Sequence, residues 1–152
     1  MSDYRAGAVA VVGRPNVGKS TLVNLVVGHK VSIVSDKPNT TRRRVNGIAT
    51  TPLWQIVFVD TPGLHRAHDK LSQTLNESAR GAMVDVEAVM VMVDGSKSPS
   101  AEDQQVASLL KDSGWIVDGL AKEQVVLCLN KMDATAARHV QENYEAYTKL
   151  FG

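Results

Sequence analysis

The sequence predicts an α/β fold with a mostly parallel sheet and helices on both faces. Four near-continuous apolar runs of strand length recur along the chain, and such runs are typical of strands buried on both sides of a parallel sheet. Longer amphipathic segments separate them, which gives the strand–helix alternation of a doubly wound domain. The four expected strands are residues 8–12, 54–60, 88–94 and 125–130.

The segments between these strands have the spacing of helices. The expected helices are residues 19–27, about 70–84, 101–111 and 136–150. Residues 43–51 add one more strand, which the short turn "TPL" joins to residues 54–60. A connection this short predicts an antiparallel pair at the edge of the sheet.

The composition limits the class of protein. The chain has 152 residues, enough for one domain with a sizeable core. Its 17 basic and 16 acidic residues give a formal charge of +1, so nothing overall indicates a nucleic-acid coat or a membrane-surface protein. Cys128, the single cysteine, lies in an apolar run and is interpreted as a core residue in a reducing compartment. Without a secretory signal or an apolar span of about 20 residues, the sequence predicts a soluble intracellular protein.

The stretch "GRPNVGKS", residues 13–20, lies between the first expected strand and the first expected helix. It matches G-x-x-x-x-G-K-[ST] in the context that this motif requires. Its two glycines let successive amides point inward, as an anion nest at the positive end of the helix. Lys19 supplies a cation for the β- and γ-phosphates, and the Ser20 hydroxyl suits Mg²⁺. The stretch therefore predicts a P-loop NTPase.

The stretch "DTPG", residues 60–63, ends the second apolar strand. Asp60 suits a direct or water-mediated hold on Mg²⁺, and Gly63 offers a backbone amide to a γ-phosphate. A turn-forming sequence after any strand looks similar, so this motif indicates little by itself.

The stretch "NKMD", residues 130–133, ends the last apolar strand. Asp133 can accept hydrogen bonds from N1 and the exocyclic N2 of guanine, and adenine lacks this pair of donors. Lys131 can lay its aliphatic stem over the base. Behind the two preceding motifs, in this order, the stretch predicts a guanine nucleotide as ligand.

Residues 35–44, "SDKPNTTRRR", form a polar segment between the first two motifs. A threonine in it can complete the Mg²⁺ shell when a γ-phosphate is present, which would order the segment. Thr41 is the first choice and Thr40 the second; the alternative is a hydrophilic loop whose threonines have no role. The three arginines at its end are interpreted as a solvated edge in preference to an RNA contact.

These motifs define the predicted site. The catalytic residues are Lys19, Thr41 and Gly63, and the metal ligands are Ser20, Thr41 and Asp60. The nucleotide contacts are the motif residues Gly13, Arg14, Pro15, Asn16, Val17, Gly18, Lys19, Ser20, Thr21, Asp60, Thr61, Pro62, Gly63, Asn130, Lys131 and Asp133.

With these stretches in order, the whole chain resembles the Era-like family of translation-factor-related P-loop GTPases. The likeness extends to "DTPGLH", residues 60–65, and to "GHKVSIVSDKPNTTRRRVNGI", residues 28–48. Related GTPases of tRNA modification share the nucleotide motifs but match the longer stretch less well. The positions of that stretch at which the family has such residues are Gly28, Lys30, Ser32, Ile33, Lys37, Thr40, Thr41, Arg42 and Gly47.

The resemblance implies Mg²⁺-dependent hydrolysis of GTP to GDP and phosphate, with the bound nucleotide acting as a switch. Leu64 stands where Ras-like GTPases carry the glutamine that orients the attacking water, so another group, a backbone-held water or a partner must do this work. Asn16 resembles an asparagine with which some relatives bind K⁺. The alternative role for Asn16 is to hold the turn of the loop.

The resemblance also implies a role in assembly of the small ribosomal subunit, with 16S rRNA bound by a C-terminal KH domain. It implies a monomer in the cytoplasm, with peripheral association at the inner membrane face as a further expectation. Against this family, residues 1–152 correspond to a GTPase domain without its last strand and helix and without the KH domain. The alternatives are a truncated guanine-nucleotide-binding module with little or no turnover, and a related GTPase of tRNA modification.

Overall fold

The computed structural model describes residues 3–31, 45–64 and 70–152. The main strands are β1 (Arg5–Val12), β2 (Val45–Thr50), β3 (Trp54–Asp60), β4 (Ala88–Asp94) and β7 (Val125–Asn130). The helices are α1 (Lys19–Val27), α2 (Lys70–Ala82), α3 (Ala101–Asp112) and α4 (Ala137–Phe151). The smaller elements are the strands β5 (Ile116–Val117) and β6 (Leu120–Ala121) and the 3₁₀ helix η1 (Met132–Ala134).

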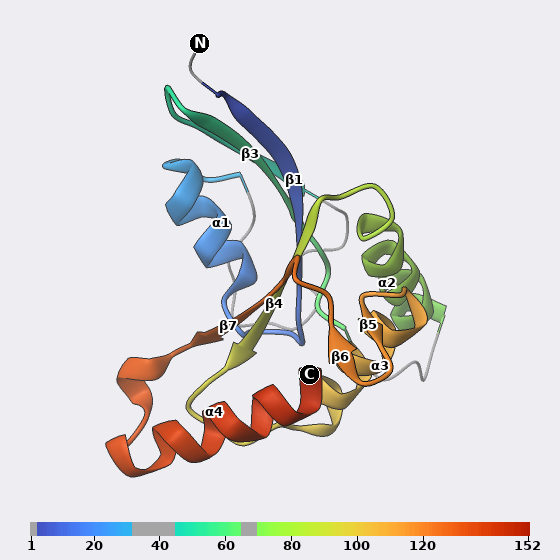
Figure 1. Ribbon diagram of the computed structural model, residues 1–152, viewed down its shortest axis with the longest axis vertical. Coiled ribbons are helices and arrows are strands. Elements are labelled where there is room, and N and C mark those ends of the chain that lie inside the picture. The colour runs from blue at the N-terminus through green and yellow to red at the C-terminus, as the bar shows by residue number, and fades with distance from the viewer. Residues whose placement is uncertain (1–2, 32–44, 65–69) are drawn as a thin grey trace.

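The main strands form one sheet in the order β2-β3-β1-β4-β7 (Figure 1). Strand β1 pairs in parallel with β3 and β4, and β4 pairs in parallel with β7. Strand β2 pairs antiparallel with β3, at the edge of the sheet. The predicted α/β architecture, mostly parallel with one antiparallel edge strand, is confirmed.

The register brings the polar ends of the strands to one edge. Val11 of β1 lies opposite Asp60 of β3, and Asp94 of β4 lies opposite Asn130 of β7. Because these strands are parallel, the loops that follow them leave the sheet on the same side. This is the edge at which open α/β sheets bind their ligands.

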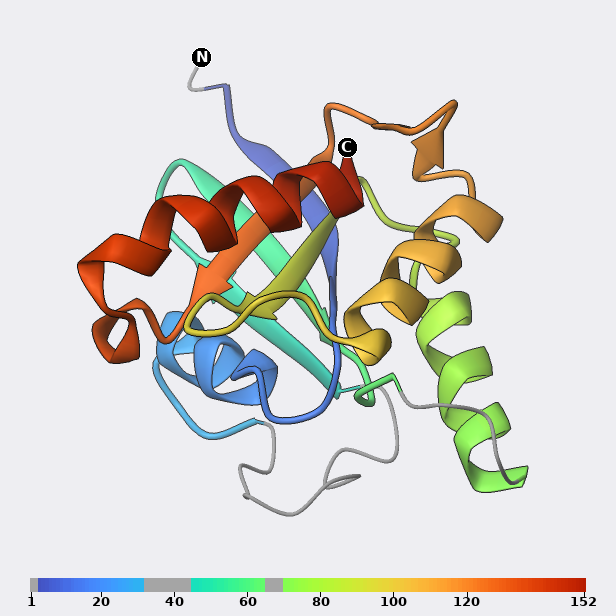
Figure 2. The ribbon, with the colours of Figure 1, turned by 90° about the horizontal axis from the view of Figure 1, so that it is seen from below.

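Helices cover both faces of the sheet, as expected. Helix α1 packs on one face, where its Val23 joins Val11, Ala49 and Phe58 in a small buried cluster. The larger cluster on the other face collects apolar side chains of α2, α3 and α4. Figure 2 shows α1 and α4 on opposite sides of the sheet. The two clusters remove apolar surface from water and so fix the strands on which the loops depend.

Most boundaries agree with the sequence prediction within two residues, and helix α1 agrees at both ends. Strand β1 begins at Arg5 instead of residue 8. Residues 43–44 of the predicted edge strand lie outside the described residues. The β5–β6 hairpin was not predicted; its two turn residues, Asp118 and Gly119, have φ angles of 53° and 82°, as two-residue hairpin turns require.

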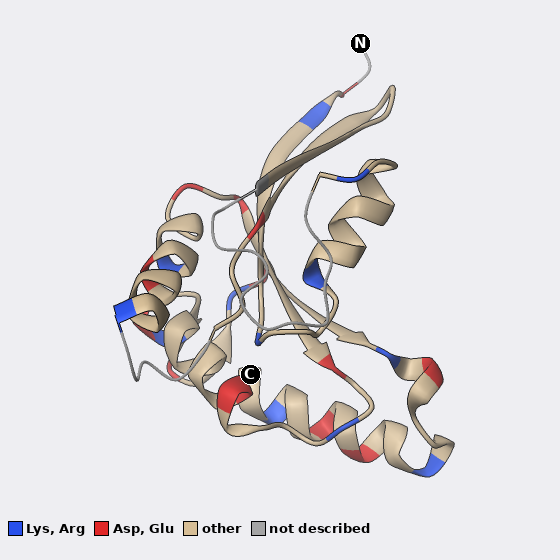
Figure 3. Cartoon of the chain, turned by 180° about the vertical axis from the view of Figure 1, so that it is seen from behind, with Lys and Arg blue, Asp and Glu red and all other residues tan. Residues whose placement is uncertain are grey.

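Helices α2, α3 and α4 each contain charged residues of both signs. On α4, Arg138 and Lys149 flank Glu142 and Glu145 (Figure 3). The predicted arginine cluster lies outside the described residues. Within those residues, no helix is both long and apolar enough to cross a membrane.

Candidate nucleotide site

The predicted phosphate loop connects β1 to α1 and folds around its own lysine. Lys19 is buried, and its Nζ donates hydrogen bonds to the carbonyl oxygens of Gly13 at 3.1 Å and Arg14 at 2.9 Å. Burial lowers the pKa of Lys19 from 10.5 to about 8, although the nearby carboxylate of Asp60 opposes the shift. A cation held against carbonyl groups at a helix start is suited to an anionic ligand.

The two glycines of the loop stand where no larger residue fits. A Cβ at Gly13 would collide with the carbonyl group of Met92 in β4. Gly18 has a φ of 104°, and a Cβ there would collide with the side chain of Asn130. The loop therefore packs closely against the ends of β4 and β7 because it lacks these side chains.

The N-terminus of α1 has no capping side chain and no negative charge of its own. The first intrahelical hydrogen bond runs from the Leu22 amide to the Gly18 carbonyl, so the amides of residues 19–21 precede it. Gly18 supplies no capping side chain, and the first turn of this helix contains no acidic residue. The positive end of the helix dipole thus faces the loop without a neutralising group from the helix itself.

Ser20 and Asp60 lie together beneath the loop. The Ser20 hydroxyl donates a hydrogen bond of 2.7 Å to Asp60 Oδ2. The other carboxylate oxygen, Asp60 Oδ1, is buried and has no hydrogen-bond partner among the described residues. A buried carboxylate oxygen without a donor is costly unless a cation neutralises it. A hydroxyl and a carboxylate oxygen this close are a donor set that fits Mg²⁺.

The "DTPG" segment packs directly against the phosphate loop. The Thr61 hydroxyl donates to the Val11 carbonyl at 2.7 Å, and the Leu64 amide donates to the Gly13 carbonyl at 3.1 Å. A Cβ at Gly63 would lie 2.7 Å from Pro15, so only glycine allows this contact. Leu64 is 2% exposed and belongs to the larger core cluster, so its side chain is a packing group.

The "NKMD" segment is fastened to the phosphate loop by two side chains. Asn130 Nδ2 donates to the Val17 carbonyl at 2.8 Å, and Lys131 Nζ donates to the Asn16 carbonyl at 2.8 Å. Lys131 and Asn16 both adopt left-handed backbone conformations, with φ near 60°. Asp133 lies in η1 and is exposed. The structure therefore brings the three described motifs together at one edge of the sheet.

One predicted segment of the site is not described, and one residue beside the site was not predicted. Thr41 and Thr40, with the whole of residues 35–44, lie outside the described residues. Asp94 was missed, although it ends β4 as Asp60 ends β3 and accepts hydrogen bonds from Arg14 and Lys131. The signal that could have found it is the acidic residue at the end of an otherwise apolar strand.

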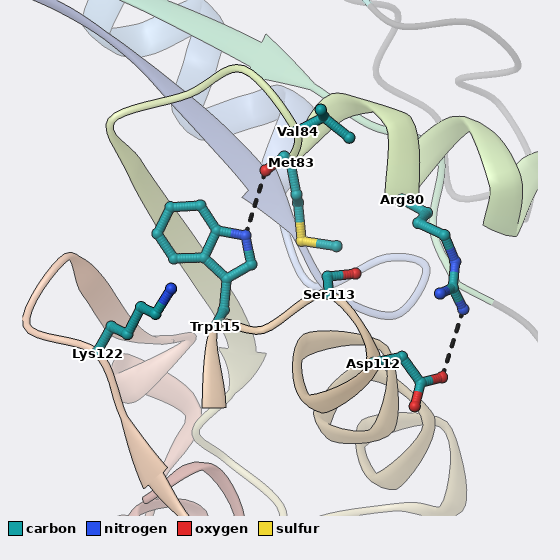
Figure 4. A pocket seen from close by; sticks show the side chains of 7 residues that line it. All are labelled: Arg80, Met83, Val84, Asp112, Ser113, Trp115 and Lys122. Atoms are coloured by element: carbon teal, nitrogen blue, oxygen red, sulfur yellow. Dashed lines mark hydrogen bonds and ion pairs between the residues drawn. The ribbon is translucent and has the colours of Figure 1, made fainter. Parts of the chain in front are cut away.

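A cavity elsewhere on the surface is not part of this site. It has a volume of about 360 Å³ and lies between the C-terminal ends of α2 and α3 and the β5–β6 hairpin (Figure 4). Trp115 forms one wall, donates to the Met83 carbonyl at 3.2 Å and has Lys122 over its ring. None of the predicted site residues lines this cavity.

Comparison with known proteins agrees with the motif order. Residues 8–131 match the model of the family described as 50S ribosome-binding GTPase. The chain belongs to this GTPase family. The segment matched contains the phosphate loop, the "DTPG" segment and the first two residues of "NKMD". The resemblance to Era is also confirmed. A GTPase Era from Geobacter metallireducens is 42% identical over 149 residues, which cover 97% of this chain and 47% of that protein.

Solved structures of Era share the fold. An Era variant from Aquifex aeolicus bound to GDP·AlF4⁻ has a TM-score of 0.78 at 33% identity and covers 92% of this chain. Era in complex with MgGDPNP and nucleotides 1506–1542 of 16S ribosomal RNA has a TM-score of 0.77 at 34% identity, over 92% of this chain. The alignments cover 46% and 45% of those two chains. The chain spans about half the length of the curated relatives it matches.

Proposed function

We propose that this chain is the nucleotide-binding part of a Mg²⁺-dependent GTPase that acts in assembly of the small ribosomal subunit. The observation that carries the proposal is the junction of the phosphate and base motifs. Asn130 and Lys131 donate to the carbonyl groups of Val17 and Asn16, both at 2.8 Å, so one ligand can reach both loops. A nucleoside di- or triphosphate could span this junction, with its phosphates at the phosphate loop and its base at the "NKMD" segment.

At the phosphate end, the proposed contacts are the amides of residues 13–21 and the Lys19 ammonium group. Ser20 and Asp60 would hold Mg²⁺, with Thr41 as a third proposed ligand. When bound, this ion would supply positive charge that offsets charge building up on the phosphate oxygens. The close packing of Gly63 against Pro15 supports a backbone contact from Gly63 to the terminal phosphate.

At the base end, the proposed specificity comes from Asp133. Its exposed carboxylate could accept hydrogen bonds from N1 and N2 of guanine, and an adenine base would leave it unpaired. The Lys131 stem would lie along the base while its ammonium group stays bound to the Asn16 carbonyl. Guanine selectivity should therefore depend on Asp133 more than on any group of the phosphate loop.

Hydrolysis requires a group other than Leu64, whose side chain is buried in the core. We propose that backbone groups hold the attacking water and that K⁺ at Asn16 supplies additional charge. The left-handed conformation of Asn16 equally supports its role in the turn of the loop. Turnover of GTP in K⁺ buffer and in Na⁺ buffer separates these roles, because a turn residue gives the same rate in both.

The ribosomal role rests on the Era relatives, of which one structure contains a 16S rRNA segment. We propose that the protein contacts 16S rRNA through a KH domain beyond the GTPase domain and that it is a cytoplasmic monomer. Peripheral attachment at the inner membrane face is a secondary proposal from the same resemblance. Retention of a 16S rRNA fragment by the chain alone would contradict the assignment of RNA binding to a separate domain.

The direct test is titration of the full chain with fluorescently labelled GDP and ADP, with and without Mg²⁺. We expect GDP to bind at least about 100-fold more tightly than ADP, because Asp133 discriminates between the bases. Equal affinity for the two nucleotides would overturn the proposal. Binding of GDP without measurable GTP turnover would support the alternative of a binding module.

A second test reverses the base preference. In Asp133→Asn, an amide replaces one carboxylate oxygen and can donate to the 2-oxo group of xanthine. We expect XDP to become the preferred ligand of this variant while the phosphate loop stays intact. Retained preference for GDP over XDP would remove Asp133 from its proposed role.

A further inference from the structure

A buried carboxylate, Asp94, lies between the two loops that the nucleotide would bridge. It ends β4, between β1 and β7 in the sheet, and is 2% exposed. A buried charge of this kind is tolerated only when it is paired and hydrogen-bonded. Its Oδ1 accepts hydrogen bonds from the amide and the hydroxyl of Ser96.

The second oxygen of Asp94 is shared by two cations from different loops. Asp94 Oδ2 lies 3.4 Å from Arg14 Nη2, which belongs to the phosphate loop. It also lies 3.3 Å from Lys131 Nζ, which belongs to the base loop. Burial alone would raise the pKa of Asp94, but the hydrogen bonds from Ser96 and Lys131 lower it below its usual value. The carboxylate is therefore ionised at neutral pH and attracts both cations.

The arginine also forms an ion pair with a buried residue of α3. Arg14 Nε lies 3.4 Å from Asp103 Oδ2, and the Asp103 side chain is fully buried at the start of α3. The Tyr147 hydroxyl of α4 donates to the backbone carbonyl of Asp94 at 3.1 Å. Two carboxylates thus hold the Arg14 guanidinium group, whose side chain is 19% exposed. This argues against Arg14 as a group that swings onto a phosphate and in favour of a structural tether.

We propose that Asp94 is a positioning residue which, through Arg14 and Lys131, fixes the spacing between the phosphate loop and the base loop. It touches neither phosphate nor base. A nucleotide must satisfy both loops at once, so any freedom in their spacing has to be removed when the ligand binds. Holding the loops in place beforehand raises affinity and keeps Asp133 in register with guanine.

This inference rests on the proposed function, and its test uses Asp94→Asn in the full chain. The variant keeps the size of the side chain but removes the charge that attracts Arg14 and Lys131. We expect GDP affinity to fall about tenfold, since misplaced loops weaken contacts at both ends of the ligand. The matched control is Asp112→Asn, which breaks an exposed ion pair to Arg80 of 3.4 Å, away from both loops. The control should stay within about twofold of the parent.

A second readout separates positioning from simple loss of folded protein. IDP lacks the exocyclic amino group of guanine, so the ratio of the IDP and GDP dissociation constants reports how well Asp133 is placed. We expect this ratio to fall in Asp94→Asn, because the base loop is no longer held through Lys131. A variant that is merely less folded binds both nucleotides more weakly by the same factor, and its ratio stays constant.

Arg14→Gln provides a second variant if Asp94→Asn does not fold, because it leaves Asp94 paired with Lys131 and Ser96. We expect weaker GDP binding from it, and in the double variant a loss smaller than the product of the two single losses. The inference is overturned if a folded variant, Asp94→Asn or Arg14→Gln, binds GDP as tightly as the parent. It is also overturned if the IDP-to-GDP ratio is unchanged in Asp94→Asn. A parent chain that does not prefer GDP over ADP would instead overturn the proposed function.

Discussion

Two helices begin at the same edge of the sheet, and their first turns are built in opposite ways. Helix α3 starts with a capping box in which Ser100 and Asp103 satisfy each other's backbone amides, and Glu102 and Asp103 place negative charge in its first turn. Helix α1 starts at Gly18 without a capping side chain, and its first charged residue is the cation Lys19. The first arrangement stabilises a helix, whereas the second leaves the positive helix end without a negative group from the helix itself.

The difference shows where the fold gives up stability for binding. A helix start that lacks caps and acidic residues forgoes about 1 kcal/mol or more relative to an optimised one. At α1 the buried, partly desolvated ammonium group of Lys19 adds a further cost, as its lowered pKa indicates. A phosphate ligand would remove both costs. Changing either helix start, or the charge of Lys19 through pH, tests this contrast.

The largest effect is expected from Lys19→Met, which keeps most of the buried stem and removes the charge. GDP affinity should fall about 100-fold or more, because the variant loses the one ammonium group of the phosphate loop. The unliganded variant should be about as stable as the parent, because removing the desolvated ammonium group offsets the loss of its attraction to Asp60. Labelled-GDP titration and thermal unfolding without nucleotide measure the two quantities. A variant that binds GDP as well as the parent would contradict the assignment of the phosphate loop.

The next effect is a dependence of GDP affinity on pH. The pKa of Lys19 is about 8 in the unliganded chain, and phosphate oxygens should raise it on binding. Affinity should then fall about tenfold from pH 7 to pH 9, with uptake of nearly one proton at pH 9. Calorimetry in buffers of different ionisation enthalpy measures this uptake. Proton uptake near zero at pH 9 would show that Lys19 does not meet the phosphates.

The lowered pKa of Lys19 affects folding in the opposite direction, because it makes stability rise with pH where GDP affinity falls. The folded pKa of about 8 lies below the ordinary lysine value of 10.5, so the folded state binds fewer protons than the unfolded state between these values. The contribution of Lys19 to stability therefore increases as pH rises from about 8 to about 10.5. This increase should appear in the parent and be absent from Lys19→Met when both are unfolded by urea across that range.

The contrast can also be tested at α3. Ser100→Ala removes the hydroxyl that accepts a hydrogen bond from the Asp103 amide. Loss of an N-cap of this type costs about 1 kcal/mol, which lowers the thermal midpoint by about 3 °C in a domain of this size. GDP affinity should change less than about threefold, because Asp103 and its ion pair with Arg14 remain in this variant. A drop in GDP affinity without a drop in thermal midpoint would mean that the start of α3 serves ligand binding instead of helix stability, which contradicts the comparison.

Local sequence patterns predicted helix α1 but not the short β5–β6 hairpin. Helix α1 was placed correctly at both ends because Gly18 and Gly28 bracket it in left-handed conformations. The β5–β6 hairpin was missed although "DG" between two apolar pairs is a hairpin signal. Its strands are only two residues long, so they carry no periodicity to read.

The meeting of the three described motifs at one edge was predictable for a similar reason, since each motif is a contiguous stretch at the end of a strand. The tether made by Asp94 was not. Arg14 and Asp94 are 80 positions apart, and their contact depends on β1 and β4 being neighbours in the sheet. Strand order of this kind is set by packing of the whole domain and leaves no mark on either residue alone.

The smallest effect is expected from placing a negative charge in the first turn of α1, where α3 has Glu102 and Asp103. Thr21 is exposed in the first turn of α1, and Thr21→Glu would place a negative charge there. Favourable interaction with the helix dipole should raise the stability of the unliganded chain by about 0.5 kcal/mol relative to Thr21→Gln. The same charge would repel phosphate, so GDP affinity should fall about threefold. Urea unfolding and GDP titration of the two variants, both at low ionic strength, give the comparison. A gain in stability together with unchanged GDP affinity would mean that the ligand does not use this helix end.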